Sequence, residues 1–177
     1  MPASRADLDA FLAGLGIRTT TVTHPPLHTV EESRALRGAI PGAHTKNLFL
    51  KDKKDAIFLV TTLEDAVLDL KRLHERIGAS GRLSFGRADL LLETLGVIPG
   101  AVTPFGLIND RGGRVNVVLD AALMANPVVN CHPLVNTATT SISAEDLVAF
   151  VRATGHQPRI VALGGSTAEG EAGRENL

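Results

Sequence analysis

Hydrophobic residues recur at helical spacing near the start of the chain. Leu8, Phe11, Leu12 and Leu15 lie three or four positions apart, and Ser4 precedes them as a candidate cap. This pattern predicts an amphipathic N-terminal helix. Further helices are predicted at 30–37, 68–78, 87–96 and 144–155.

Three of these helices carry recognisable end signals. Thr29 followed by Glu32 is the spacing of a capping box, which closes the start of a helix with two reciprocal hydrogen bonds. Ser143 precedes the last helix in the same way, and Gly78 ends the helix at 68–78.

Apolar and β-branched runs predict the strands. They lie at 18–24, 44–52, 56–63, 114–120, 126–143 and 159–164. The second and third runs flank the polar turn DKKD and are typical of a hairpin. Because strands and helices do not alternate regularly, we expect one α+β domain over residues 1–163, a mixed β-sheet with helices packed around it. The small polar residues of 164–177 predict a flexible tail.

The composition is that of a globular protein with an aliphatic core. Of the 177 residues, 44% are hydrophobic and 21% charged, with six Phe and neither Trp nor Tyr. Cys131 is the single cysteine, which excludes an internal disulfide and fits a reducing compartment. The N-terminus carries acids and does not resemble a basic, apolar leader, and no apolar stretch approaches the ~20 residues that span a bilayer. We therefore expect a cytoplasmic location and no membrane partner.

Charge is distributed unevenly although the net charge is only -1. Residues 34–87 hold eleven of the 18 Lys and Arg but six of the 19 Asp and Glu, an excess of five positive charges. This segment could face a phosphate backbone while the whole chain stays near neutral. An unevenly charged but merely solvated surface is the alternative.

Several common chemistries find no support in the sequence. There is no P-loop, no strand-linked GxGxxG and no pair of cysteines. His24 and His28 have a ligand-like spacing, but Pro25 and Pro26 between them forbid a helix, so we predict no metal site. Cys131 and His132 are neighbours in an extended segment, where adjacent side chains point to opposite faces, so they cannot act as a pair.

Three features remain as candidates for chemistry, each with a simpler interpretation. Lys46 and Asn47 open a strongly apolar strand, where a lysine is costly unless it reaches an anion or water. The sequence GVIPG (96–100) makes a stiff turn whose backbone can approach a ligand, or is only a turn. His132 begins a polar, extended segment that includes Asn136, where it could be catalytic or structural.

Taken together, three segments resemble the YbaK/prolyl-tRNA synthetase-associated domain family, in its free-standing alanyl-tRNA(Pro) deacylase branch. They are KNLFLKDKK (46–54), GVIPGAVTPFGL (96–107) and HPLVNT (132–137). The resemblance runs in order from about residue 24 to residue 164. It implies a mixed-sheet α+β fold and trans-editing, the hydrolysis of Ala-tRNA(Pro), with no metal, no cofactor and no protein nucleophile.

The resemblance also assigns roles to residues. Lys46 matches the essential lysine of the family, Gly100 lies in its GxxPG loop, and His132 is its HPL histidine, so these three are the predicted catalytic positions. The predicted substrate-binding positions are Asn47, Pro99, Ala101, Arg82 and Asn136. The expected partners are the acceptor end of a mischarged tRNA and prolyl-tRNA synthetase, and the oligomeric state stays open.

A mechanism follows as a hypothesis. Lys46 would bind a terminal phosphate or orient the ester, the GVIPG backbone would polarise the carbonyl, and His132 would orient the ribose hydroxyl or a water. The alternatives are a deacylase for Cys-tRNA(Pro) or another aminoacyl-tRNA, a non-catalytic tRNA-binding module, and a small-molecule binding domain.

Overall fold

The computed structural model describes residues 1–27 and 29–164, which form a mixed sheet with helices around it. The strands are β1 (Thr20–Thr23), β2 (Ala43–Lys51), β3 (Ile57–Leu63), β4 (Ser84–Phe85), β5 (Val115–Asp120), β6 (Val128–Cys131), β7 (Ala138–Ser143) and β8 (Arg159–Val161). The helices are α1 (Arg5–Gly14), α2 (Val30–Ala39), α3 (Leu73–Ile77), α4 (Ala88–Leu95), the 3₁₀ helix η1 (Pro104–Asn109), α5 (Ala121–Met124) and α6 (Ala144–Ala153).

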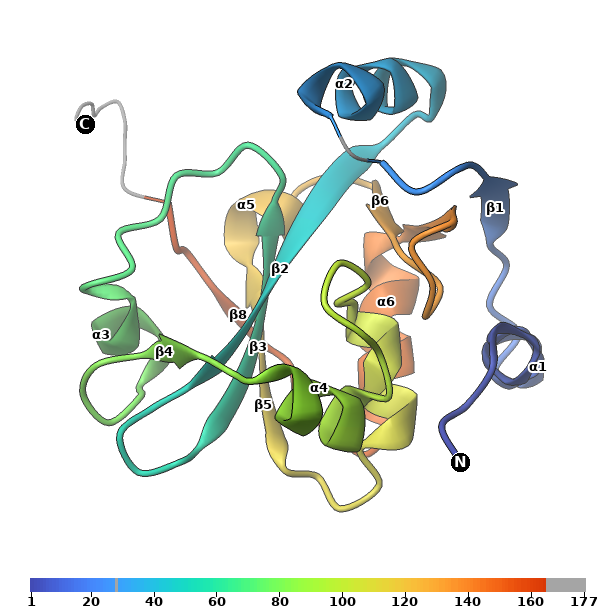
Figure 1. The fold of residues 1–177 in the computed structure, drawn as a ribbon. Coiled ribbons are helices and arrows are strands. Elements are labelled where there is room, and N and C mark those ends of the chain that lie inside the picture. Colours follow the sequence, from blue (N-terminus) through green and yellow to red (C-terminus); the bar gives the residue numbers. More distant parts are fainter. Residues whose placement is uncertain (28, 165–177) are drawn as a thin grey trace.

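The sheet has eight strands in the order β1-β7-β6-β2-β3-β5-β8, with β4 added beside β2 (Figure 1). The hairpin of β2 and β3 is antiparallel, whereas β2 with β6, β3 with β5 and β5 with β8 are parallel. The predicted α+β fold class with a mixed sheet is therefore confirmed.

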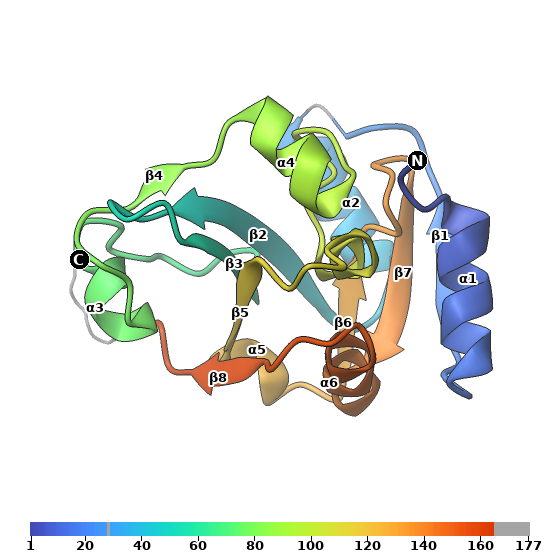
Figure 2. The ribbon, with the colours of Figure 1, turned by 90° about the horizontal axis from the view of Figure 1, so that it is seen from below.

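Both faces of the central hairpin are covered, which explains the continuous apolar run of β3. Leu59 packs into the larger core, with side chains of α1, α4, η1 and α6. Its neighbours Phe58 and Val60 face the smaller core under α3. Figure 2 shows α1 and α3 at opposite ends of the molecule, with the hairpin between them. Alternate side chains of β2 and β3 thus enter two separate cores.

Local end signals set most of the helix boundaries correctly. Ser4 and Thr29 each accept a hydrogen bond from the third helical residue, and both capping boxes are complete. The Ser143 side chain caps α6 by accepting from the N–H of Asp146. Gly78 and Gly96 end α3 and α4 in the left-handed conformation that glycine adopts without strain.

Two predictions of secondary structure were wrong. The helix expected at 68–78 is only α3, because residues 69–72 form a turn in which the Asp69 carboxylate accepts from the N–H of Lys71. The run at 126–143 is not one extended segment but two antiparallel strands, β6 and β7, joined by a turn with Leu134 at φ 71. The short helices η1 and α5 were not predicted, and the tail expected at 164–177 lies outside the described residues from 165 onward.

Candidate active site

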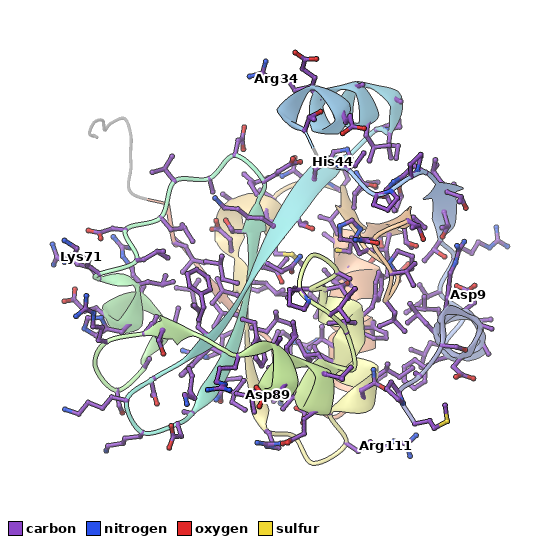
Figure 3. All side chains as sticks on the ribbon, in the orientation of Figure 1. Asp9, Arg34, His44, Lys71, Asp89 and Arg111 are labelled. Carbon is purple, nitrogen blue, oxygen red and sulfur yellow. The ribbon has the colours of Figure 1, made fainter. Side chains whose placement is uncertain are left out.

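The sheet divides between β2 and β6, and a cavity of about 560 Å³ lies at the division. The two strands pair only through Ala43 and His44 on β2, opposite Val129 and Asn130 on β6. Beyond these residues the strands separate, and the turn after α4 reaches the gap with Gly100 and Val102. Figure 1 shows this turn between β2 and β6, and Figure 3 shows His44 at the start of β2, beside α2.

Five of the eight predicted site residues line this cavity: Lys46, Asn47, Gly100, His132 and Asn136. The other three do not. Pro99 is exposed, the side chain of Ala101 is buried in the larger core, and Arg82 is exposed on the loop before β4. The structure therefore brings together the three predicted catalytic positions from three distant parts of the sequence, but it separates Arg82 from them.

The ammonium group of Lys46 is held in place by the main chain. Its Nζ donates a hydrogen bond of 2.5 Å to the carbonyl of Ala66, on the segment that follows β3. Within β2, Lys46 is on the same face as Leu48 and Leu50, which pack in or against the smaller core. Lys46 therefore lies next in this row of apolar side chains, and its hydrogen bond to Ala66 holds a positive charge at the wall of the cavity.

Asn47 offers both its side chain and its main chain to the cavity. Its Oδ1 accepts a 2.6 Å hydrogen bond from the Thr61 hydroxyl, which orients the amide so that Nδ2 is left to donate. Because the carbonyl of His44 accepts from Glu64 on the β3 side, strand alternation directs the N–H and C=O of Asn47 away from β3. No strand among the described residues pairs with that edge of β2 over 46–48.

The turn at 98–101 places peptide groups at the cavity, and its glycine, Gly100, has no side chain to cover them. The N–H of Ala101 donates to the carbonyl of Ile98, and Gly100 has a φ of +92°. A Cβ at Gly100 would have only the Nδ2 of Asn136 within 4 Å, at 3.7 Å. The requirement for glycine is therefore conformational, and it leaves the backbone of the turn open to a ligand.

His132 is fixed as a hydrogen-bond acceptor toward the cavity. Its Nδ1 lies 3.1 Å from the carbonyl of Ala138, which can only accept, so Nδ1 carries the proton. Burial lowers the pKa of His132 and the charge of His24 lowers it further, whereas the hydrogen bond to Ala138 and the charge of Glu64 oppose that shift. The ring is therefore neutral at pH 7, with the lone pair of Nε2 left to accept a hydrogen bond.

Cys131 does not have the properties of a nucleophile. Its side chain is buried, and burial raises the pKa of its thiol to about 12, against the opposing effect of a hydrogen bond from Thr45. The thiolate, which is the reactive form, is therefore scarce at neutral pH. This agrees with the expectation that Cys131 and His132 do not act as a pair.

Besides Cys131, eight further residues of the cavity were not among the predicted site residues. They are Leu27, Leu36, His44, Thr45, Glu64, Val102, Asn130 and Thr139. The Thr139 hydroxyl lies 2.9 Å from Nε2 of His24, whose Nδ1 donates to the carbonyl of Pro25. Capping signals and spacing along the chain could not reveal these residues, because contacts between segments far apart in the sequence bring them to the cavity.

No group of three or more His, Cys, Asp or Glu within 1–27 and 29–164 could hold a metal ion. Across the same residues, no helix has the length and apolar character needed to cross a membrane.

The comparison with known proteins points to one family. Residues 24–150 match the family described as the aminoacyl-tRNA editing domain. The chain is 44% identical over 161 residues to a prolyl-tRNA synthetase associated domain-containing protein 1 of Mus musculus, covering 89% of this chain and 95% of that protein. It is 38% identical over 155 residues to the prolyl-tRNA editing protein ProX of Acetoanaerobium sticklandii, covering 87% and 94%.

A solved structure supports the fold assignment. The crystal structure described as a "putative trans-editing enzyme for prolyl tRNA synthetase" aligns with a TM-score of 0.68 at 22% identity, covering 93% of this chain and 100% of that one. At this identity the likeness concerns the fold alone.

Proposed function

Because the chain belongs to the aminoacyl-tRNA editing domain family, we propose that it hydrolyses the ester bond of a mischarged tRNA, with alanyl-tRNA(Pro) as its main substrate. The observation that carries the proposal is the convergence of Lys46, the turn at Gly100 and His132 on one cavity. An aminoacyl ester is already activated, so positioning and charge stabilisation can supply most of the catalysis.

The mechanism uses these groups without a protein nucleophile. A water attacks the ester carbonyl, and negative charge grows on the carbonyl oxygen in the tetrahedral intermediate. Lys46 and the peptide groups around Gly100 stabilise that charge or orient the ester. The neutral His132 accepts a hydrogen bond at Nε2 from the ribose hydroxyl or the attacking water, which orients it. The bond to the ribose oxygen then breaks, this oxygen takes up the proton that the attacking water has lost, and alanine and the free tRNA leave.

The choice of amino acid rests on the apolar wall of the cavity. Leu27 precedes α2, Leu36 is on α2, and Val102 faces the cavity from the turn after α4. A wall of this kind can reject a larger side chain such as proline by steric overlap. It discriminates poorly against a smaller one, since one methylene is worth only about 1–3 kcal/mol. We therefore expect glycyl and seryl esters to be minor substrates.

The remaining expectations about organisation belong to the same proposal. Residues 1–163 would form the editing domain, and the enzyme would act in trans beside prolyl-tRNA synthetase in the cytoplasm. The cluster of Lys53, Lys54 and Arg82, called the hairpin cluster below, would contact phosphates of the acceptor stem and not the ester itself.

The test compares deacylation of alanyl-, cysteinyl- and prolyl-tRNA(Pro) by the wild type, Lys46→Ala and Lys51→Ala. We expect the wild type to prefer the alanyl ester and Lys46→Ala to lose about 100-fold or more in kcat/KM, since it removes a fixed charge beside the carbonyl. Lys51 lies on the same strand but is paired with Asp55 at the far end, so its variant controls for charge.

Three results would contradict the proposal. A preference for the cysteinyl ester would reassign the substrate, and full activity of Lys46→Ala would remove Lys46 from the mechanism. Binding of tRNA without turnover by the wild type would instead identify a non-catalytic module. Circular dichroism at matched temperature checks that each variant is folded.

A further inference from the structure

The mechanism proposed above assigns no binding partner to the positively charged α-amino group of the substrate. A free α-amino group titrates at about pH 7.7–8.0, so much of an aminoacyl ester carries an ammonium group at neutral pH. Lys46 repels that group, and the peptide N–H groups of the turn cannot accept its protons. The ammonium group therefore needs an acceptor of opposite charge elsewhere in the cavity.

Glu64 is the only carboxylate among the described residues that line the cavity. It follows β3, and its N–H donates a 2.9 Å hydrogen bond to the carbonyl of His44, which continues the pairing of β2 with β3 by one residue. In this register Glu64 is opposite His44 and diagonal to Lys46, which is opposite Thr62. Its side chain therefore points to the same face as Lys46.

A second observation links Glu64 to the far wall of the cavity. The charge of Glu64 raises the pKa of His132 against the larger lowering by burial, so the carboxylate acts electrostatically on the ring across the gap between the strands. Lys46 is held by the carbonyl of Ala66, only two residues beyond Glu64. The segment 64–66 thus supplies the carboxylate and also fixes the neighbouring positive charge.

We propose that Glu64 binds the α-ammonium group of the aminoacyl ester and makes the cavity selective for esters with a free amino group. This inference rests on the proposed function. An ester whose amine is acylated has lost the charge and gained bulk, so an N-acetylated or peptidyl ester is rejected. An ester in which a hydroxyl replaces the amine keeps the shape but carries no positive charge. Glu64 therefore does not favour its binding.

The experiment uses one tRNA carrying three esters: alanyl, lactyl and N-acetylalanyl. Each is hydrolysed at pH 7 under single-turnover conditions with enzyme in excess, so that slow reactions remain measurable. The wild type should act on alanyl far better than on N-acetylalanyl. Glu64→Gln should lower the rate on alanyl by about 10- to 100-fold, the range expected for one hydrogen bond to a charged group, and leave the lactyl rate unchanged.

Asp65→Asn is the matched control, because Asp65 is the exposed neighbour of Glu64 and does not line the cavity. Removing any acidic charge strengthens attraction to a polyanion, so a general charge effect would raise the rates of both variants on every ester. The predicted effect of Glu64→Gln has the opposite sign. Glu64→Asp, which keeps the charge, should recover part of the alanyl rate.

The outcomes separate the two proposals. If the wild type hydrolyses none of the three esters, the proposed function fails. If the wild type is active but Glu64→Gln keeps the full alanyl rate, or loses alanyl and lactyl rates equally, the ammonium-binding role is overturned. Lactyl hydrolysis by Glu64→Gln also reports that the variant is folded.

Discussion

At the scale of single residues, His132 illustrates how burial and one carbonyl together fix a protonation state. The carbonyl of Ala138 places the proton on Nδ1, and burial disfavours a second proton on Nε2. A protonated ring could only donate at Nε2, whereas the proposed orientation of a hydroxyl or water requires an acceptor there. The protonation state is therefore as important to the mechanism as the position of the ring.

This leads to a prediction about pH. Because burial lowers the pKa of His132 below the ordinary histidine value of 6.5, most rings are neutral at pH 7 and the midpoint of protonation lies below pH 6.5. We expect ¹⁵N NMR of histidine-labelled protein, with His132→Ala to assign the signals, to show the Nδ1–H tautomer at pH 7. A midpoint above 6.5, or the Nε2–H tautomer, would contradict the assigned role.

At the scale of elements, the short strand β4 is attached to β2 by a close glycine contact. The N–H of Gly86 donates to the carbonyl of Phe49, directly after the pairing of β4 with Leu50 and Lys51. A Cβ at Gly86 would lie 2.4 Å from two ring carbons of Phe49, whose side chain is buried in the larger core. The ring cannot move away without disturbing that core.

We therefore expect Gly86→Ala to lower the free energy of unfolding by about 1–3 kcal/mol, the usual cost of overpacking. Gly14→Ala is the control, because nothing lies within 4 Å of a Cβ there and the residue is helical. That variant should be neutral or more stable by up to about 1 kcal/mol. Urea unfolding followed by circular dichroism measures both, and an unchanged midpoint for Gly86→Ala would refute the steric argument.

The elements also show what the sequence could and could not reveal. Capping residues such as Ser4, Thr29 and Ser143 act within a few positions, so helix ends were predictable from local chemistry. The order of strands depends on pairs far apart in the chain, such as His44 with Asn130. Motif resemblance supplied Lys46, Gly100 and His132, whereas Glu64 and Thr139 belong to the cavity only through that pairing.

At the scale of the whole molecule, the positive charge of residues 34–87 lies partly far from the cavity. Lys46 and Lys51 are five positions apart along β2, a distance of about 16 Å at ~3.3 Å per residue. Beyond them, Lys53 donates its N–H to Ser80 and lies against Gly81, next to the exposed Arg82. Figure 3 shows Lys71 on the side of the molecule away from Asp9. A ligand that reached both cavity and hairpin cluster would have to be long and polyanionic.

The salt dependence of tRNA binding tests this arrangement. Each phosphate contact contributes about 0.7–0.9 to the slope of log Kd against log salt. Replacing Lys53, Lys54 and Arg82 together by Gln should reduce that slope by about 2 to 3. The control replaces three exposed arginines outside the segment, Arg18, Arg111 and Arg152, and should change it little. Equal changes in the two triple variants would mean that only net charge matters.

The separation of β2 from β6 has a consequence for how the folded chain meets other chains. An open strand edge normally invites another extended peptide to add on, which is a route to aggregation. Here the peptide groups of Asn47, with which no strand of the described residues pairs, lie at a recess that the glycine turn and His132 also line. A recess of this kind shields the strand edge from edge-to-edge pairing and keeps its hydrogen-bonding groups available to a compact ligand.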